Sequence, residues 1–214
     1  MKFDRESMLL YAVTDRTWLN GRTLPELVEQ AILGGTTFVQ LREKNVTDTE
    51  FLSIAEQVKK VTDQYHVPFI INDNIEVALK ADADGVHVGQ KDMEAGNVRE
   101  LIGKDKILGV SAQTVEQALA AERSGADYLG VGAVFSTATK QDAQNVGISV
   151  LKEICRAVSI PVVAIGGINA YNIKELKGSG IAGAAVVSAL FAQNDIKAAA
   201  ENLSFLLREA AAQK

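Results

Sequence analysis

The sequence predicts a single (β/α)8 barrel, and three observations point to this fold. Short apolar runs of the kind that form buried parallel strands occur eight times along the chain. Segments of helical periodicity lie between them, and an alternation of strand and helix is typical of a parallel sheet with right-handed crossovers. The repeats follow one another at roughly 20 to 25 residues, so that eight of them fill the 214-residue chain with one closed barrel.

The predicted strands have bodies that are nearly all apolar, and polar residues or glycines gather where the strands end. This is the pattern expected of strands buried on both faces. In chain order the strands are LLYAVT (9–14), TFVQL (37–41), PFIIN (68–72), GVHV (85–88), ILGVS (107–111), YLGVG (128–132), PVVAIG (161–166) and GAAVV (183–187).

Helical patterns separate these strands, and several end in glycine, which favours the left-handed residue after a helix. The clearest are LPELVEQAILGG (24–35), DTEFLSIAEQVKKVTDQ (48–64) and TVEQALAAERSG (114–125). No linker, low-complexity tract or charge block divides the chain. We therefore expect residues 1–214 to form one domain, with a core over about 9–207.

An open, doubly wound sheet is the alternative architecture. Against it, the first strand is followed by TDRTWLNGRT and not by a GxGxxG turn. The pair Gly166-Gly167 comes late in the chain, after the seventh strand, where barrels commonly bind phosphate.

The composition is that of a globular protein, with 47% hydrophobic and 23% charged residues. A net charge of -5 and a pI near 5.2 argue against sequence-independent nucleic-acid binding, which needs a basic face. Any anionic ligand must therefore be held by locally placed cations. The sequence leaves open whether the chain forms a homo-oligomer.

Cys155 is the only cysteine, which rules out an intramolecular disulfide and a cysteine-based zinc cluster. It lies in the helix-like run SVLKEICRAV, where we expect a small buried hydrophobe rather than a nucleophile. The start of the chain, MKFDRESMLL, lacks the apolar region of a signal peptide, and no run approaches the ~20 apolar residues of a membrane span. These features predict a cytoplasmic protein without a membrane segment.

Polar side chains at the strand ends should meet at one mouth, because all strands of such a barrel run the same way. Gln40, Arg42 and Lys44 occur at every second position, which places them on one side of the second strand. Arginine offers a fork of donors and lysine a point charge, a combination that suits phosphate or diphosphate. In isolation such a set is more often a structural ion-pair group, but the other strand ends favour a ligand.

Asp73 and Asp92 follow neighbouring strands, where two carboxylates can share one hard cation. Mg²⁺ needs only one or two carboxylates, completed by water and substrate phosphate oxygens. The alternatives are structural: Asp73 as the N-cap of IEVALK, with Asn74 as its rival, and Asp92 as a turn residue. His87, within GVHV, is interpreted as a core histidine with no role in proton transfer.

Three further segments complete the predicted mouth. The polar stretch 136–147 is longer than a strand-to-helix connection requires, and its Thr137, Thr139 and Lys140 could fold over a ligand and exclude water. Gly166-Gly167 permits close backbone approach. Val187-Ser188 opens a helical turn that can present amides to a phosphate.

Taken in order, the motifs QLREK, IND, HVGQKD, GVS, TATK, IGGI and VVS closely resemble those of the thiamine-phosphate synthase family, also called thiamine-phosphate pyrophosphorylase. The resemblance covers about Tyr11 to Phe191. It implies a transferase that joins 4-amino-2-methyl-5-hydroxymethylpyrimidine diphosphate to 4-methyl-5-(2-hydroxyethyl)thiazole phosphate. The implied products are thiamine phosphate and pyrophosphate, and the implied cofactor is Mg²⁺.

The resemblance also implies roles for individual residues. The pyrimidine diphosphate site would comprise Gln40, Leu41, Arg42, Glu43, Lys44, Asn72, Ser111 and Lys140, and the magnesium ligands would be Asp73 and Asp92. The thiazole phosphate site would comprise Thr137, Ala138, Thr139, Gly167, Val187 and Ser188. Arg42, Lys44, Ser111 and Lys140 would be the catalytic residues among these. One departure is visible, since the family usually has proline where this chain has Ser136.

Three rival functions remain at the level of sequence. A thiazole tautomerase on the same barrel would bind thiazole phosphate but would not need Asn72, Asp73, Asp92 and Lys140. A sugar-phosphate isomerase or epimerase barrel would share the glycine pair and Ser188 but would need an acid/base pair at the mouth. A non-catalytic binding barrel is the third.

Overall fold

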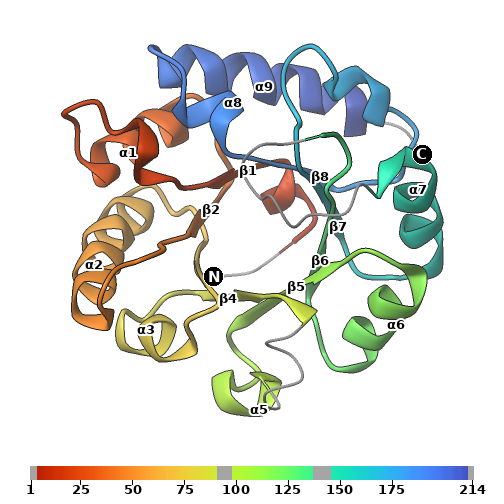
Figure 1. The fold of residues 1–214 in the computed structure, drawn as a ribbon, viewed down its shortest axis with the longest axis horizontal. Coiled ribbons are helices and arrows are strands. Elements are labelled where there is room, and N and C mark those ends of the chain that lie inside the picture. The colour runs from red at the N-terminus through yellow and green to blue at the C-terminus, as the bar shows by residue number, and fades with distance from the viewer. Residues whose placement is uncertain (1–3, 91–97, 137–145, 212–214) are drawn as a thin grey trace.

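The computed structural model describes residues 4–90, 98–136 and 146–211, which form a closed barrel of parallel strands with helices around it (Figure 1). Each strand pairs with the next along the chain, and β8 pairs with β1 to close the ring. The predicted (β/α)8 fold is confirmed, and every predicted run contains a strand. The strands are β1 Leu10–Val13, β2 Phe38–Leu41, β3 Phe69–Asn72, β4 Gly85–Val88, β5 Ile107–Ala112, β6 Tyr128–Val131, β7 Val162–Ile165 and β8 Gly183–Val186.

The helices cover the outside of the strands as a ring (Figure 1). Between β7 and β8 the described chain forms only the short 3-10 turn η3, over Ile173–Leu176, and the long C-terminal helix α9 packs beside it. The helices are α1 Leu24–Leu33, α2 Asp48–Gln64, α3 Ile75–Lys80, α5 Val98–Ile102, α6 Val115–Arg123, α7 Gly147–Ala157, α8 Ser188–Phe191 and α9 Ile196–Ala211, with further 3-10 turns η1 Glu6–Met8 and η2 Arg16–Trp18.

Three of these helices begin at a threonine whose hydroxyl accepts a hydrogen bond from a backbone amide of the first turn. Thr23, Thr47 and Thr114 cap α1, α2 and α6 in this way. At α1 the Glu26 side chain also accepts from the Thr23 amide at 2.6 Å, which completes a capping box. These caps satisfy amides that would otherwise lack partners and fix where each strand-to-helix connection ends.

Side chains alternate between the inside of the barrel and the layer between strands and helices. On β2, Phe38 belongs to the interior cluster, which also holds Tyr11, Ile70 and Tyr128. Val39 and Leu41 belong to the larger cluster that packs against the helices. Residues of even number on β2 therefore face inward, and Gln40 points into the interior. The same alternation determines which side the residues that follow the strand are expected to face.

The end of the barrel where the strands begin is closed by the turn η1. Its Met8 is fully buried in the interior cluster, together with Ile107 and Ala182 from the starts of two strands. The Arg5 guanidinium fastens this turn by donating to the carbonyls of Gly180 and Ile181 at 2.8 and 2.7 Å. This closure leaves the opposite end as the open mouth.

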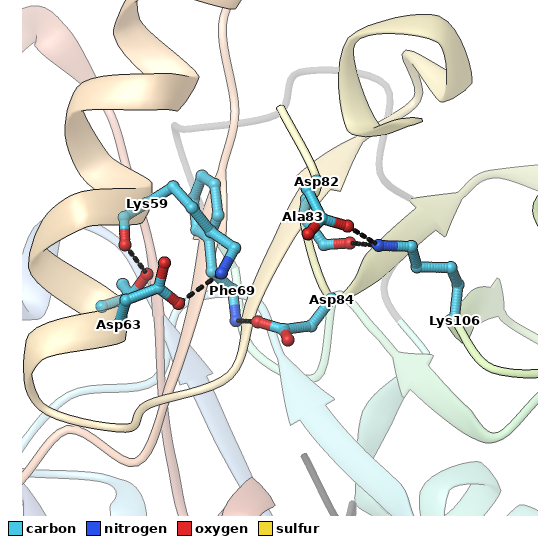
Figure 2. A network of polar contacts seen from close by, with 8 residues as sticks. Lys59, Asp63, Phe69, Asp82, Ala83, Asp84 and Lys106 are labelled. Atoms are coloured by element: carbon cyan, nitrogen blue, oxygen red, sulfur yellow. Dashed lines mark hydrogen bonds and ion pairs between the residues drawn. The ribbon is translucent and has the colours of Figure 1, made fainter. Parts of the chain in front are cut away.

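A polar network joins neighbouring strands at this closed end (Figure 2). The Asp84 carboxylate accepts a hydrogen bond from the Phe69 amide at 2.8 Å, and the Asp84 amide donates to the Phe69 carbonyl at 2.7 Å. Lys106 donates to the Ala83 carbonyl at 2.7 Å and pairs with Asp82 at 2.5 Å. Since active sites of such barrels lie at the other end, this network serves stability.

A second aspartate two strands further on repeats the arrangement. Asp127 accepts from the Leu108 amide at 2.7 Å and from the Arg99 guanidinium at 2.6 Å. Arg99 also donates to the carbonyls of Gly103, Lys106 and Gly125, so that one side chain ties α5 to the starts of β5 and β6.

Candidate active site

A chain of five polar side chains crosses the interior of the barrel. The Gln40 amide donates to the Tyr11 hydroxyl at 2.6 Å, and the hydroxyls of Tyr11 and Tyr128 lie 2.8 Å apart. Tyr128 lies 2.8 Å from Nδ1 of His87, and Nε2 of His87 lies 2.9 Å from the Ser111 hydroxyl. The chain thus links two residues of the predicted pyrimidine site, Gln40 and Ser111, through three side chains from β1, β6 and β4.

Two glycines make the room that these rings occupy. A Cβ atom on Gly109 would lie 2.2 Å from the Tyr128 ring, and one on Gly130 would lie 2.9 Å from the His87 ring. Side chains larger than hydrogen would therefore displace the rings that connect Tyr11 to Ser111. The glycines within ILGVS and YLGVG consequently have a packing role that involves the site.

The two tyrosines of this chain are held in their neutral form. Burial raises the pKa of Tyr11 above the ordinary value of 10, and its hydrogen bonds with Tyr128 and Gln40 offset only part of this. Burial also raises the pKa of Tyr128, and the neighbouring Tyr11 adds to the effect. Both phenols therefore act as hydrogen-bonding groups and not as acids.

Arg42 and Lys44 follow the end of β2, and the period of two predicts that they lie on the same side as Gln40. The Arg42 amide donates to the Thr14 hydroxyl at 3.0 Å, which attaches this segment to the end of β1. Within the parts of the chain that the structure describes, neither the Arg42 guanidinium nor the Lys44 ammonium forms an ion pair or a side-chain hydrogen bond. These contacts leave both cations available to an anion and do not support the structural ion-pair alternative.

Leu41 and Glu43 point to the other side, as the two-residue period predicts. Leu41 is fully buried against the helices. The Glu43 side chain is only 2% exposed and pairs with Arg16 at 2.8 Å. Burial raises the pKa of Glu43, an effect that Arg16 opposes. The side chains of Leu41 and Glu43 are thus structural, and only their backbone could contribute to a ligand at the mouth.

Asn74, not Asp73, is the N-cap of α3. The Asn74 side chain accepts a hydrogen bond from the Val77 amide at 2.9 Å, which decides between the two candidates in the sequence. Asp73 adopts a positive φ of 62°, and its backbone amide donates to the His87 carbonyl at 2.9 Å. The Asp73 carboxylate accepts a hydrogen bond from the Asn72 side-chain amide at 2.6 Å. The Asp73 carboxylate is therefore held at the end of β3 without a capping duty.

An open pocket of about 470 Å³ lies beside this turn. Six of its nine lining residues are polar, and the apolar ones are Phe51 of α2, Ile75 of α3 and Val46, which precedes α2. Its lining residues are Glu43, Asn45, Val46, Asp48, Phe51, Asn72, Asp73, Asn74 and Ile75. Among the described residues there is no cluster of three or more acidic, histidine or cysteine side chains able to hold a metal. Asp92 lies outside the described residues.

The far side of the mouth is formed by the glycine pair after β7. Gly166 and Gly167 have positive φ values of 98° and 68°, and a Cβ on Gly167 would lie 2.5 Å from the Ser136 carbonyl. The Gly167 carbonyl accepts from the side chains of Asn169 and Asn172 at 3.2 and 2.9 Å. Val187 and Ser188 follow β8, with Ser188 as the first residue of α8. Thr137, Ala138, Thr139 and Lys140 lie outside the described residues.

Reasoning from the sequence missed Tyr11, Tyr128 and Thr14 and gave His87 no role at the mouth. The inward phase of β1 and β6 could have indicated the two tyrosines, because both occupy positions that face the interior. The lone Cys155 lies away from this constellation, and burial raises the pKa of its thiol to about 11, which makes it a poor nucleophile.

The fold and this constellation define a (β/α)8 barrel whose mouth suits an anionic small molecule. A family model described as thiamine monophosphate synthase matches residues 10–190. The chain belongs to the thiamine monophosphate synthase family, as its motifs predicted. No described helix is both long and apolar enough to cross a membrane.

Individual relatives agree with this assignment. The chain is 56% identical to a thiamine-phosphate synthase of Clostridium tetani, over 94% of this chain and 96% of that protein. It is 59% identical to a thiamine-phosphate synthase of Ruminiclostridium cellulolyticum, over 91% and 92% of the two chains. A solved structure of a thiamine phosphate pyrophosphorylase from Pyrococcus furiosus has a TM-score of 0.88 and 40% identity, over 96% of this chain and 98% of that one.

Proposed function

We propose that this chain is a thiamine-phosphate synthase, the activity named for its relatives. It would transfer the 4-amino-2-methylpyrimidinylmethyl group from its diphosphate to the nitrogen of 4-methyl-5-(2-hydroxyethyl)thiazole phosphate, releasing pyrophosphate. The observation that carries the proposal is the pair Arg42 and Lys44, which leave β2 beside the polar interior with no ion pair among the described residues.

The diphosphate is the group that these cations would bind. Arg42 can donate two parallel hydrogen bonds and Lys44 adds a point charge. Lys140 would complete the set from the segment outside the described residues. The pyrimidine would lie against Gln40, Asn72 and Ser111, which the barrel gathers from β2, β3 and β5.

A divalent cation fits the acidic side of this mouth. Asp73 and Asn72 supply the hard oxygen donors that Mg²⁺ prefers, and Asp92 would be the second carboxylate. Mg²⁺ needs no complete protein cage, so the absence of a three-ligand cluster among the described residues is compatible with it. When bound, Mg²⁺ would neutralise the charge that develops on the departing diphosphate.

The thiazole phosphate would occupy the glycine side of the mouth. Gly167, Val187 and Ser188 would line it from the ends of β7 and β8. The resemblance to the family adds Thr137, Ala138 and Thr139, which lie outside the described residues. Gly166 and Gly167 have positive φ values, which glycine adopts without strain, and they pack closely against residues 133–136, so that the segment after β6 lies beside this side of the mouth.

The chemistry needs no protein nucleophile. An electron-rich aminopyrimidine can expel pyrophosphate to leave a stabilised carbocation, which the thiazole nitrogen then captures. Arg42, Lys44 and Lys140 would stabilise the leaving group, and the interior side chains would hold the ring in place. Exclusion of water from the mouth would prevent hydrolysis of the cation.

A two-substrate assay tests the proposal directly. Purified protein should release pyrophosphate only when the pyrimidine diphosphate, the thiazole phosphate and Mg²⁺ are all present. Release of no pyrophosphate, together with isomerisation of a thiazole phosphate or of a sugar phosphate, would favour one of the rival barrels. We also propose that the enzyme works in the cytoplasm, in keeping with its single cysteine.

A further inference from the structure

The hydrogen-bonded chain of five side chains inside the barrel can have a direction, in which each group donates a hydrogen bond to the next. A hydroxyl has one proton to donate, and a neutral imidazole has one N–H and one acceptor nitrogen. In a continuous chain of such groups, a donor at one end favours the order in which each hydroxyl donates to the next, because the opposite order leaves the proton of the first hydroxyl without an acceptor in the chain. Here the group at one end is the Gln40 amide, and the group at the other end is the Ser111 hydroxyl.

The order of protons follows from the first contact. Nε2 of Gln40 donates to the Tyr11 hydroxyl at 2.6 Å, so Tyr11 acts there as an acceptor. The Tyr11 proton can then be donated to the Tyr128 hydroxyl, 2.8 Å away. The Tyr128 proton is in turn available to Nδ1 of His87 at 2.8 Å.

His87 converts this order into a defined tautomer. If Nδ1 accepts from Tyr128, the single proton of the neutral ring lies on Nε2, 2.9 Å from the Ser111 hydroxyl. Ser111 then accepts from His87, and its own proton is free to point toward the mouth. The chain lies in the interior, where Tyr11 and Tyr128 are almost fully buried, so water competes little with this order.

We propose that Tyr11, Tyr128 and His87 are positioning residues that fix Ser111 as a hydrogen-bond donor to the pyrimidine substrate. The site would accordingly select a ligand that presents an acceptor, such as a ring nitrogen, to Ser111. This inference rests on the proposed function for the identity of the ligand, but the proton order itself is a property of the ligand-free protein.

The first experiment observes the tautomer. The chain has only two histidines, His66 and His87, so protein labelled with ¹⁵N-histidine gives two imidazole patterns in a long-range ¹⁵N–¹H spectrum. His66 is exposed and has a positive φ of 56°, which asparagine tolerates, so His66→Asn assigns the signals. We expect His87 to be neutral with Nε2 protonated, and an Nδ1–H tautomer or an imidazolium would overturn the proposal.

The second experiment uses a matched pair of variants. Tyr128→Phe removes the donor to Nδ1 and should release His87 from a single tautomer. Tyr11→Phe breaks the chain one step earlier, between Gln40 and Tyr128, so it should also leave His87 in a mixture of tautomers. A single Nε2–H tautomer that persists in either variant would contradict the proposed order. If Tyr128→Phe does not fold, the spectrum of the unmodified chain still decides the question.

Steady-state kinetics then tests whether the proton order affects binding of the pyrimidine substrate. Tyr128→Phe should raise KM for the pyrimidine diphosphate by about 10-fold, the worth of one hydrogen bond of roughly 1 to 1.5 kcal/mol, and leave KM for the thiazole phosphate nearly unchanged. An equal rise for both substrates would indicate a general structural defect and would refute the positioning role. If the unmodified protein releases no pyrophosphate, the proposed function is refuted. The tautomer of His87 is measured without substrate, so that result does not affect it.

Discussion

The Asn72 side-chain amide donates a hydrogen bond to the Asp73 carboxylate at 2.6 Å, which orients one carboxylate oxygen at the end of β3. The next residue, Asn74, takes over the capping of α3. Asp73 thus lies at the end of β3 and does not cap α3. Its position in the sequence, shortly before the helix, would also have suited a capping residue. Its replacement should therefore affect catalysis more than stability.

Asp73→Asn should raise the Mg²⁺ concentration needed for half-maximal activity by roughly 10- to 100-fold, because a neutral amide is a weaker ligand for a hard cation. The measurement is pyrophosphate release against Mg²⁺ concentration. Asp48→Asn removes a second carboxylate from the same pocket and is the matched control, with a Mg²⁺ dependence close to that of the unmodified chain. An equal shift in both variants would show that only the overall charge of the pocket matters.

Arg42→Ala should reduce turnover by roughly 100-fold, the usual effect of removing one preorganised group that stabilises developing negative charge. The fold should remain intact, since the Arg42 guanidinium has no partner among the described residues and the backbone contact to Thr14 persists. Steady-state rates and thermal unfolding measure the two effects. Lys60→Ala, which removes an exposed cation from α2, should change neither quantity. Turnover in Arg42→Ala equal to that of the unmodified chain would remove Arg42 from the diphosphate site.

Arg99→Ala should lower the free energy of unfolding by about 2 to 4 kcal/mol and leave KM for both substrates unchanged. The guanidinium donates to three carbonyls and to Asp127 at the closed end of the barrel, and its loss leaves these acceptors without a charged donor. Urea unfolding followed by circular dichroism measures the change. Lys104→Ala removes an exposed neighbouring cation and serves as the control. Unchanged stability of Arg99→Ala would mean that water replaces the guanidinium at no cost.

Glu43 should make stability depend on pH. Burial raises its pKa above the ordinary value of 4.5, so the folded chain holds this proton more tightly than the unfolded chain does. Protonated Glu43 contributes its full stabilisation at pH values below the pKa that it has in the unfolded chain. This stabilisation is lost as the pH rises through the pKa that it has in the folded chain. Relative to Glu43→Gln, the unmodified chain should therefore lose stability as the pH rises from the ordinary pKa of about 4.5 toward neutral. Urea unfolding of both proteins across this range measures the difference, and a difference independent of pH would contradict the raised pKa.

The barrel was predictable from the sequence because its strands are buried on both faces. Runs such as PFIIN and PVVAIG then differ sharply from the amphipathic helices between them. The period of two also placed Gln40 on the opposite side from Leu41 and Glu43 correctly, since this rule depends only on backbone geometry.

The interior polar chain was not predictable in the same way. Tyr11 and Tyr128 occur within apolar runs, where a tyrosine is easily interpreted as core, and their hydroxyls meet only because β1 and β6 face each other across the barrel. The choice between Asp73 and Asn74 as helix cap was likewise open in the sequence. Both residue types make good caps, and only the positive φ of Asp73 separates them.

The Tyr128 ring occupies the space that a side chain at position 109 would need, so the sizes of the side chains at these two positions depend on each other. An alanine at position 109 would need a side chain shorter than tyrosine at position 128, so a single substitution should be costly and a compensating pair should be tolerated. Such an exchange would remove the Tyr128 hydroxyl from the interior polar chain and leave the side chains at the mouth unchanged. Substitutions at positions 109 and 128 could thus change the hydrogen bonding of Ser111 through His87 without changing Ser111 itself.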